Sequence, residues 1–139
     1  MTAFLGLLDA ERHEVRYHAG GQGPIMIFRA ETGSFEWRAA TTVPLGYMAG
    51  LPLGDAETVL LGPGDILGLI TDGVFECESP AAEMFGIARV EELVRMHHES
   101  PMARLAEALL EETRMFAGAR PPSDDITIVL LRRLTERGC

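Results

Sequence analysis

The first half of the chain consists of short apolar or alternating runs joined by polar turns, which is typical of β-strands. The expected strands cover residues 2–8, 14–18, 24–29, 35–39, 57–61 and 65–71. The first two should pair across the turn 9–13 and the next two across the loop 31–34. The last two are predicted to form a hairpin across Gly62-Pro63-Gly64. Residues 41–56 are rich in Gly and Pro and predict an irregular loop.

Towards the C-terminus the apolar positions recur at helical spacing. These positions are Ile87, Val90, Leu93, Val94, Met102, Leu105, Leu109 and Phe116. We interpret the Met and Phe side chains of this series as core packing rather than as a cofactor-binding surface. Ser100 followed by Pro101 predicts a helix N-cap with proline at the first helical position. The last helix should end near Gly118, because Pro121 and Pro122 prevent its continuation.

A last apolar run, residues 126–131, predicts a closing strand. The order of elements is therefore β, then α, then β, with no internal repeat and no linker that would divide the chain. We expect residues 1–139 to form a single domain. An antiparallel sheet layer packed against a helical layer places the chain in the α+β class.

Two short acidic motifs lie where apolar runs meet turns. The first is Asp72-Gly73, at the end of one run. The second, Ser123-Asp124-Asp125, opens the last run. Carboxylates at the ends of neighbouring core strands can converge on a hard divalent cation such as Mg²⁺ or Mn²⁺. A structural interpretation competes with this one, because Asp-Gly is a common turn signal and Ser-Asp-Asp can be a solvated loop.

Composition limits the class of protein. Hydrophobic residues make up 47% of the chain and charged residues 24%, as in a globular domain. The net charge of −9 argues against a nucleic-acid partner, since phosphate backbones need a basic surface. No apolar run approaches the roughly 20 residues of a membrane span. Met1 is not followed by a basic leader region, so we expect a cytoplasmic protein without membrane contact.

The cysteines and histidines do not suggest a site. Cys77 and Cys139 are too few for a disulfide framework, and Cys139 is the last residue of the chain. The 4 histidines do not have the spacing of metal ligands. We interpret them as surface or helix-end residues.

Several further motifs follow one another in a fixed order. Residues 60–76 run Leu-Leu-Gly-Pro-Gly-Asp-Ile-Leu-Gly-Leu-Ile-Thr-Asp-Gly-Val-Phe-Glu. The others are Ala19-Gly20-Gly21 with Gly23-Pro24, Pro44-Leu45-Gly46, Glu83-Met84-Phe85-Gly86 with Arg89-Val90, and Asp124-Asp125-Ile126-Thr127. Over about residues 2–133 this series resembles the SpoIIE/RsbU-like branch of the PPM metal-dependent serine/threonine protein phosphatases.

The resemblance implies a sandwich of antiparallel sheets flanked by helices and a centre that holds two Mn²⁺ or Mg²⁺ ions. It implies that Asp72 and Asp124 are the metal ligands contributed by this chain. Asp125 is expected beside them, in a structural role or hydrogen-bonded to a metal-bound water. Gly73 is expected to let the backbone turn tightly under Asp72.

Two departures from the family pattern affect these expectations. The family's first metal-binding motif, an Asp-Val-Ser-Gly-His-Gly-like segment, has no match here, so we expect the C-terminal portion of a phosphatase domain. A sandwich incomplete at its N-terminus should expose a sheet face or edge, which predicts a homo-oligomer. The second departure is Gly21, which stands where the family usually has His. Thr71 and Thr127 are expected to fill sheet positions.

Three functions are compatible with these observations. The resemblance implies a phosphoserine/phosphothreonine protein phosphatase of bacterial stress or sigma-factor signalling, whose phosphoprotein substrate could be an anti-sigma-factor antagonist. The first alternative is a non-catalytic remnant of the fold that acts as a protein-interaction or regulatory module. The second is a small-molecule-binding or structural domain in which the aspartates are turn residues. Two carboxylates hold Mg²⁺ weakly, so we expect the isolated chain to be a poor or inactive enzyme.

Overall fold

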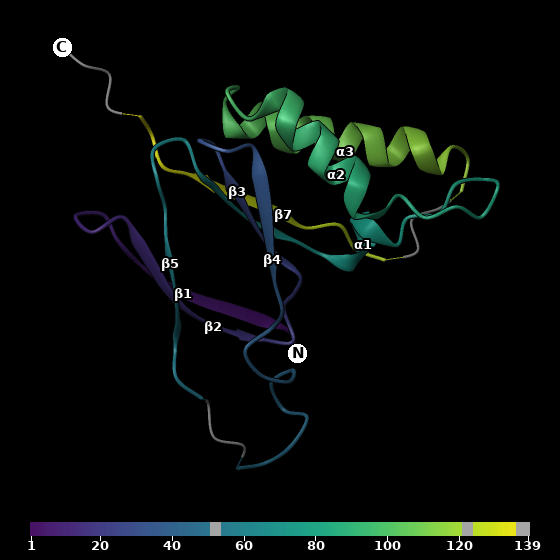
Figure 1. Cartoon of the computed structure of the whole chain (residues 1–139). Helices are drawn as coiled ribbons and strands as arrows, with labels where there is room; N and C mark the ends of the chain where they lie inside the picture. The colour runs from purple at the N-terminus through teal and green to yellow at the C-terminus, as the bar shows by residue number, and fades with distance from the viewer. Residues whose placement is uncertain (51–53, 121–123, 136–139) are drawn as a thin grey trace.

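Two antiparallel sheets pack face to face, and helices cover the outer face of one of them (Figure 1). The computed structural model describes residues 1–50, 54–120 and 124–135. The predicted α+β class is confirmed, and the second sheet makes the fold a sandwich.

The three-stranded sheet has the order β1-β2-β5, with β1 (Ala3–Asp9), β2 (Glu14–Gly20) and β5 (Glu57–Leu60). The four-stranded sheet has the order β4-β3-β6-β7, with β3 (Ile25–Arg29), β4 (Ser34–Arg38), β6 (Ile66–Ile70) and β7 (Ile128–Arg132). The helices are α1 (Asp72–Phe75), α2 (Gly86–His97) and α3 (Met102–Ala117).

Strand β3 separates two apolar cores. Met26 and Phe28 face the helices, whereas Ile25 and Ile27 face the other sheet. Successive residues of a strand point to opposite faces, and here both faces are covered, so all four side chains are buried. This explains why β3 is a continuous apolar run rather than an alternating one, because both of its faces are covered.

The prediction of a hairpin across residues 62–64 is wrong. β5 pairs with β2, whereas β6 pairs with β3 and β7, so the chain crosses from one sheet to the other here. The buried Asp65 carboxylate holds the crossing by accepting hydrogen bonds from the Gly62 N–H (2.9 Å) and the Ala30 N–H (2.9 Å). It also accepts one from Arg29 Nη1 at 2.8 Å. A hairpin and a crossing use the same Gly and Pro residues, so the local pattern does not distinguish them.

The helical periodicity is confirmed for most positions. Val90, Leu93 and Val94 of α2 and Leu105 and Leu109 of α3 are buried in the core that contains the outer face of the four-stranded sheet. Ile87 lies in the first turn of α2, as its helical spacing predicts, but it is 42% exposed and outside this core.

The termini of α3 differ partly from the prediction. Pro101 is the N-cap residue and no side chain caps the helix, so the predicted Ser100 cap is wrong. The Ser100 carbonyl instead accepts a hydrogen bond from Arg132. The helix ends as predicted at Gly118, whose φ of 60° lies in the left-handed region that favours glycine. Pro121 and Pro122 lie outside the described residues.

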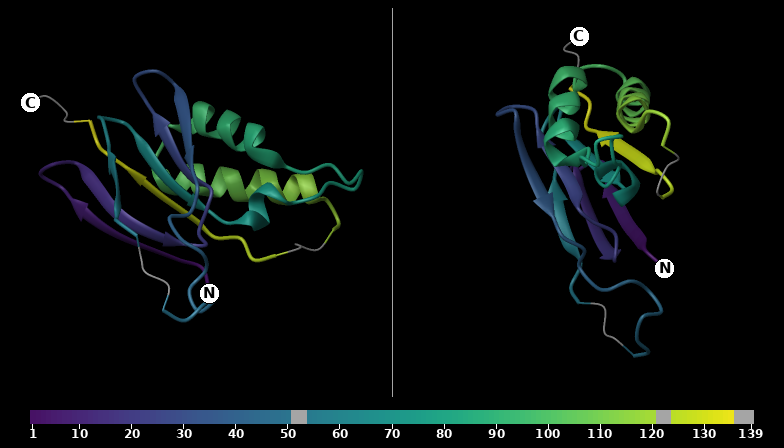
Figure 2. Two further views of the ribbon diagram at one scale, coloured as in Figure 1. Left: turned by 60° about the horizontal axis from the view of Figure 1, so that its bottom comes forward. Right: turned by 90° about the vertical axis from the view of Figure 1, so that its right-hand side faces the viewer.

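The outer face of the three-stranded sheet is uncovered in the part of the chain that the structure describes. Figure 2 shows α2 and α3 together on the side of the four-stranded sheet. Leu5, Leu7 and Leu60 are exposed by 75%, 72% and 62%. Leu5 lies opposite His18, and Leu7 opposite Arg16, so the leucines share this face with polar side chains. This is the exposed sheet face that the sequence predicts.

Candidate metal centre

The two acidic motifs lie at the same end of the strand pair β6–β7. The strands are antiparallel, with Ile70 opposite Ile128. The residues that follow β6 and the residues that precede β7 are therefore neighbours. Asp72 is the first residue of α1, and Asp124 and Asp125 stand just before β7. The topology thus brings Asp72 to the same end of the sheet as Asp124 and Asp125, which lie more than fifty positions later in the sequence.

Thr71 and Thr127 join the two acidic segments. The Thr71 N–H donates to the Thr127 carbonyl at 3.1 Å, and the Thr127 N–H donates to Thr71 Oγ1 at 2.8 Å. The Thr71 hydroxyl lies 3.2 Å from the Asp125 carbonyl oxygen, to which it donates. Both threonines stand one residue outside the assigned strands, where the bond between their main chains extends the β6–β7 pairing, so they lie at the end of the sheet rather than within it. The Thr71 hydroxyl positions the main chain that carries the aspartates.

Gly73 is required for a close approach rather than for a tight turn. It is buried within α1, and it is not among the glycines with positive φ. A Cβ atom at this position would lie 2.6 Å from the Asp125 carbonyl oxygen and 3.2 Å from that of Asp124. The sequence-based explanation for Gly73 is therefore wrong, and its absent side chain is what lets α1 contact the second acidic segment.

The three carboxylates line one hollow of about 250 Å³. Its lining residues are Thr2, Gly21, Gln22, Gly23, Thr71, Asp72, Asp124, Asp125 and Thr127. Every polar side chain in this set can offer an oxygen ligand, which suits Mg²⁺ or Mn²⁺ in kind. Among the described residues, however, no three His, Cys, Asp or Glu side chains gather closely enough to hold a metal ion. The hollow therefore offers part of a coordination shell.

The carboxylates differ in their local contacts. Asp124 Oδ1 accepts the Asp125 N–H at 2.7 Å. The side chains of Asp72 and Asp125 make no hydrogen bond to another described residue. All three residues are exposed, so a cation could reach them from solvent. Ser123, the first residue of the second motif, lies outside the described residues.

Neighbouring polar residues do not join this set. Glu76 is exposed at the end of α1 and lines a different hollow, with Met84 and Arg114 among its other walls. Cys77 is buried there, and burial raises the pKa of its thiol, which disfavours the thiolate that metals and electrophiles need. Cys139 lies outside the described residues.

Gln22 was not predicted as a site residue, and it lines the hollow from the segment between β2 and β3. Its signal was available, because Gln22 is the one carboxamide side chain in the sequence and has glycine on both sides. Gly21, the position of the family histidine, has φ +64°, and a Cβ there would lie 2.5 Å from Pro44 Cγ. A side chain at position 21 does not fit this backbone.

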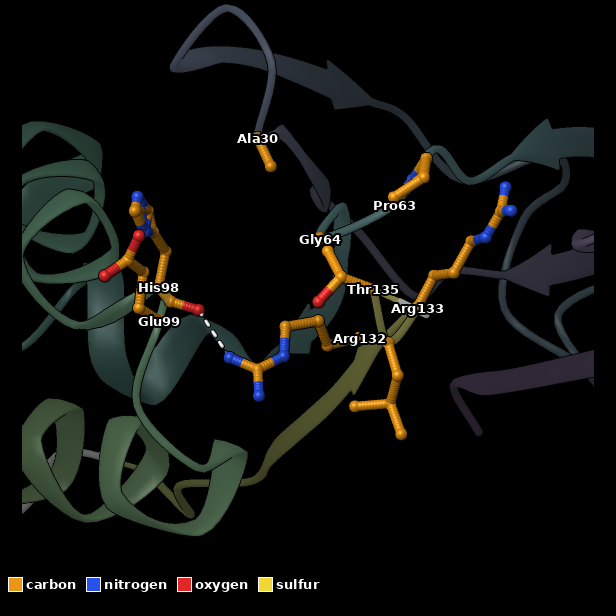
Figure 3. Close-up of a pocket in the computed structure, with 9 residues that line it drawn as sticks. Ala30, Pro63, Gly64, His98, Glu99, Arg132, Arg133 and Thr135 are labelled. Atoms are coloured by element: carbon orange, nitrogen blue, oxygen red, sulfur yellow. Dashed lines mark hydrogen bonds between the residues drawn. The ribbon is translucent and has the colours of Figure 1, made fainter. Parts of the chain in front are cut away.

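A larger hollow of about 760 Å³ lies at the opposite end of β6 and β7, beside Gly64 and Arg133 (Figure 3). Arg132 Nη1 donates to the carbonyls of His98 (2.6 Å) and Ser100 (2.8 Å), so it holds the end of α2. Figure 3 shows the Arg132 and Arg133 side chains pointing in different directions. This hollow therefore does not gather its charged groups around one point.

No helix in the described ranges is long and apolar enough to cross a membrane.

Comparison with known proteins agrees with this architecture. The sequence model of the family described as Stage II sporulation protein E (SpoIIE) matches residues 1–134. Protein IcfG of Synechocystis sp. is 26% identical over 132 residues, which cover 95% of this chain and 20% of IcfG.

Solved structures share the fold. The RsbU and RsbW domains of a Mycobacterium tuberculosis protein are similar with a TM-score of 0.74 and 27% identity, over 95% of this chain and 36% of that one. The SiaA-PP2C domain of Pseudomonas aeruginosa is similar with a TM-score of 0.71 and 24% identity, over 96% of this chain and 51% of that one. The phosphatase domain of SpoIIE from Bacillus subtilis is similar with a TM-score of 0.72 and 18% identity, over 99% of this chain and 59% of that one.

The chain therefore spans a fifth of the length of IcfG and between 36% and 59% of these solved chains. The family match extends over nearly the whole sequence, and the sandwich with its flanking helices is that of the PP2C-type domains. The chain belongs to the SpoIIE family, in the SpoIIE/RsbU-like branch of the PPM phosphatases.

Proposed function

We propose that this chain is part of a metal-dependent phosphatase that hydrolyses phosphoserine and phosphothreonine in proteins. The observation that carries the proposal is the hollow in which Asp72, Asp124 and Asp125 meet at one end of β6 and β7. A hollow lined by carboxylates would repel a phosphate monoester unless cations lay between them. The donor set therefore favours a metal-assisted reaction over direct attack by a side chain.

Asp72 and Asp124 are the proposed metal ligands. A bound Mn²⁺ or Mg²⁺ would supply hydroxide near neutral pH and neutralise charge on the phosphoryl oxygens. Asp72 stands on a short helical turn that packs through Gly73 against the main chain of Asp125, which brings it beside the segment that carries Asp124. The Asp125 side chain is free to accept a hydrogen bond from a metal-bound water, while its carbonyl is bonded to Thr71.

The proposed substrate is a phosphoprotein of a bacterial stress or sigma-factor pathway, of the kind represented by anti-sigma-factor antagonists. The similarity to a protein that carries RsbU and RsbW domains supports this class. We propose that the reaction takes place in the cytoplasm.

A second candidate function is a non-catalytic interaction or regulatory module. It is favoured by the absence, in the described part of the chain, of three grouped ligands. The uncovered face with Leu5, Leu7 and Leu60 is the surface that such a module would use. We propose that the isolated chain self-associates through this face.

Calorimetric titration with Mn²⁺, run beside hydrolysis of p-nitrophenyl phosphate, separates the two functions. The variants are Asp72→Asn and, as a matched control on an exposed loop, Asp55→Asn. Binding and turnover that are lost only in Asp72→Asn support the phosphatase. Binding without turnover assigns catalysis to a longer polypeptide and favours the module for this chain. Binding that Asp72→Asn does not weaken would contradict the proposed ligand set.

A further inference from the structure

The segment that joins β2 to β3 presents a single side chain to the hollow. Gly21 and Gly23 have none, and Gln22 stands between them. Gln22 is partly buried, and its carboxamide makes no hydrogen bond to another described residue. Its two N–H donors and its carbonyl oxygen are therefore uncommitted.

Hydrogen bonds fix the main chain on the N-terminal side of Gln22. The Gly21 N–H donates to the Thr42 carbonyl at 2.8 Å, and the Thr42 N–H donates to the Ala19 carbonyl at 3.0 Å. The Ala19 N–H donates to Thr41 Oγ1 at 2.8 Å. On the other side, Gly21 forms a bridge to Ala3 of β1. The segment is thus held between β1 and residues 41–42.

Close packing fixes the glycines beside Gln22. The left-handed Gly21 lies under Pro44, whose Cγ would be 2.5 Å from a Cβ at position 21. A Cβ on Gly23 would lie 3.1 Å from the Ala40 nitrogen. Because both neighbours are pressed against other parts of the chain, position 22 is the place where this segment can carry a functional group towards the hollow.

The described lining of the hollow has no cationic side chain for an anion. It contains no Lys, Arg or His, and three of its residues are aspartates. The Thr71 hydroxyl is already bonded to the main chain on the other side. Among the described lining side chains, Thr2 and Thr127 offer hydroxyl donors, and Gln22 is the one with N–H groups. A phosphoryl group drawn in by a cation would still need a donor on the side away from the carboxylates.

We propose that the Gln22 carboxamide binds the phosphoryl group of the substrate by donating an N–H to one of its oxygens. The inference rests on the proposed function, since the phosphoryl group is brought there by the cation. Gln22 serves in place of a side chain at position 21, which the backbone at Gly21 excludes. The chemical class of the ligand is a phosphate monoester or inorganic phosphate.

Magnetic resonance can observe this side chain by itself. The sequence contains one Gln and no Asn, so Gln22 gives the one carboxamide NH₂ pair in a proton–nitrogen correlation spectrum of the labelled chain. Paramagnetic Mn²⁺ at the hollow should broaden this pair together with the main-chain amides of Asp72 and Asp125. In Mg²⁺, inorganic phosphate should then shift the Gln22 pair downfield, and the shift should be absent in Asp72→Asn.

Each outcome separates the inference from the proposed function. Broadening of the Asp72 and Asp125 amides without any change at Gln22 overturns the inference and leaves the metal centre intact. No selective broadening anywhere overturns both. Broadening at Gln22 without a phosphate shift also overturns the inference, because the carboxamide would then lie near the cation without contacting the anion.

Variants provide a second, independent measurement. Gln22→Leu keeps a side chain of similar size without donors, and it should weaken phosphate binding to the Mn²⁺-loaded chain by about tenfold. The affinity for Mn²⁺ itself should change by less than about twofold. Gln22→Glu should weaken phosphate further through like-charge repulsion, and it should tighten Mn²⁺ binding by adding a carboxylate. Equal phosphate affinity in wild type and Gln22→Leu, or a large loss of Mn²⁺ affinity in Gln22→Leu, overturns the inference.

Discussion

The main-chain carbonyl oxygen of Asp125 occupies the space in which a side chain on Gly73 would have to lie, 2.6 Å from the ideal Cβ position. Main-chain contact between α1 and the segment before β7 therefore sets the separation of Asp72 from Asp124. Because this contact does not involve the carboxylates, the spacing of the two acidic segments does not depend on a bound cation.

Replacing Gly73 by Ala should push the two acidic segments apart. Overpacking at a buried position costs about 1–3 kcal/mol, and here the neighbour is main chain that cannot rotate away. We expect a loss of stability in this range in urea denaturation and weaker Asp72-dependent Mn²⁺ binding. Gly54→Ala is the control, since a Cβ there meets nothing within 4 Å. Equal effects of the two substitutions would contradict the role of the Gly73 contact.

Gly21→Ala should be destabilising for two separable reasons. The left-handed φ of +64° costs a non-glycine residue about 1–2 kcal/mol, and the clash with Pro44 adds to this. In the double variant with Pro44→Ala the clash with Cγ and Cδ of the ring is relieved, whereas the 3.0 Å approach to the Cα of residue 44 and the backbone cost remain. Denaturant midpoints of the single and double variants measure the coupling. Additive effects would show that the Pro44 ring does not restrict position 21.

Asp65→Ala should weaken the crossing between the sheets. It removes the acceptor for the Gly62 and Ala30 N–H groups and one partner of Arg29, whose side chain is only 25% exposed. Breaking a buried charged pair and leaving N–H groups unpaired predicts a loss of about 2–4 kcal/mol. Thermal and urea unfolding measure it, with the exposed Asp55→Ala as control. A change below about 0.5 kcal/mol would contradict this role.

Stability should depend on Glu36 in acid. The hydrogen bond from Arg29 Nε at 2.6 Å lowers the pKa of the Glu36 carboxyl below its usual value, against the opposing effect of burial. Because the pKa is lower in the folded state, the pair stabilises the fold above the unfolded value of about 4.3. This contribution is lost as the pH falls through the folded pKa.

Comparison of wild type with Glu36→Gln tests this dependence. The Glu36 side chain is 42% exposed, so the difference at neutral pH should be about 1 kcal/mol or less. The difference should shrink as the pH is lowered below about 4. Glu31→Gln, on the exposed loop between β3 and β4, should show no such trend. A difference that grows in acid would contradict the assigned sign.

The uncovered leucine face should mediate self-association. Leu5→Lys places a charge at the exposed centre of β1, opposite His18, and should shift sedimentation towards the monomer. Met96→Lys is the control, since Met96 is an exposed apolar residue on α2, on the helical side of the molecule. Equal association of both variants would assign the contact to another surface.

Local periodicity predicted most of the elements, because burial in this fold follows the strand and helix repeats. The alternating β2 and the helical positions Val90 and Leu105 are examples, as their apolar side chains face a core. The crossing at residues 62–65 was not predicted. Its direction depends on Asp65 and Arg29, which are far apart in the sequence and whose pairing the local pattern does not contain.

In the candidate site, too, local motifs were predicted and contacts between distant residues were not. Asp72, Asp124 and Asp125 were predicted from motifs, and the topology places them around one hollow. Gln22 was not predicted, because its relevance depends on Gly21 being closed off by Pro44, a contact between distant segments. The role of Gly73 was misjudged for a related reason, since the space beside it is filled by the Asp125 main chain.

The hydrogen bonds between Thr71 and Thr127 also govern how fast their amide hydrogens exchange with solvent. The N–H group of each residue is bonded to the other, so neither can exchange with solvent deuterium until this clip opens. The clip continues the β6–β7 pairing at the end that carries the aspartates. Deuterium uptake at these two amides therefore times the opening of the hollow, and uptake at Ile27, which is fully buried between the sheets, times the opening of the whole fold.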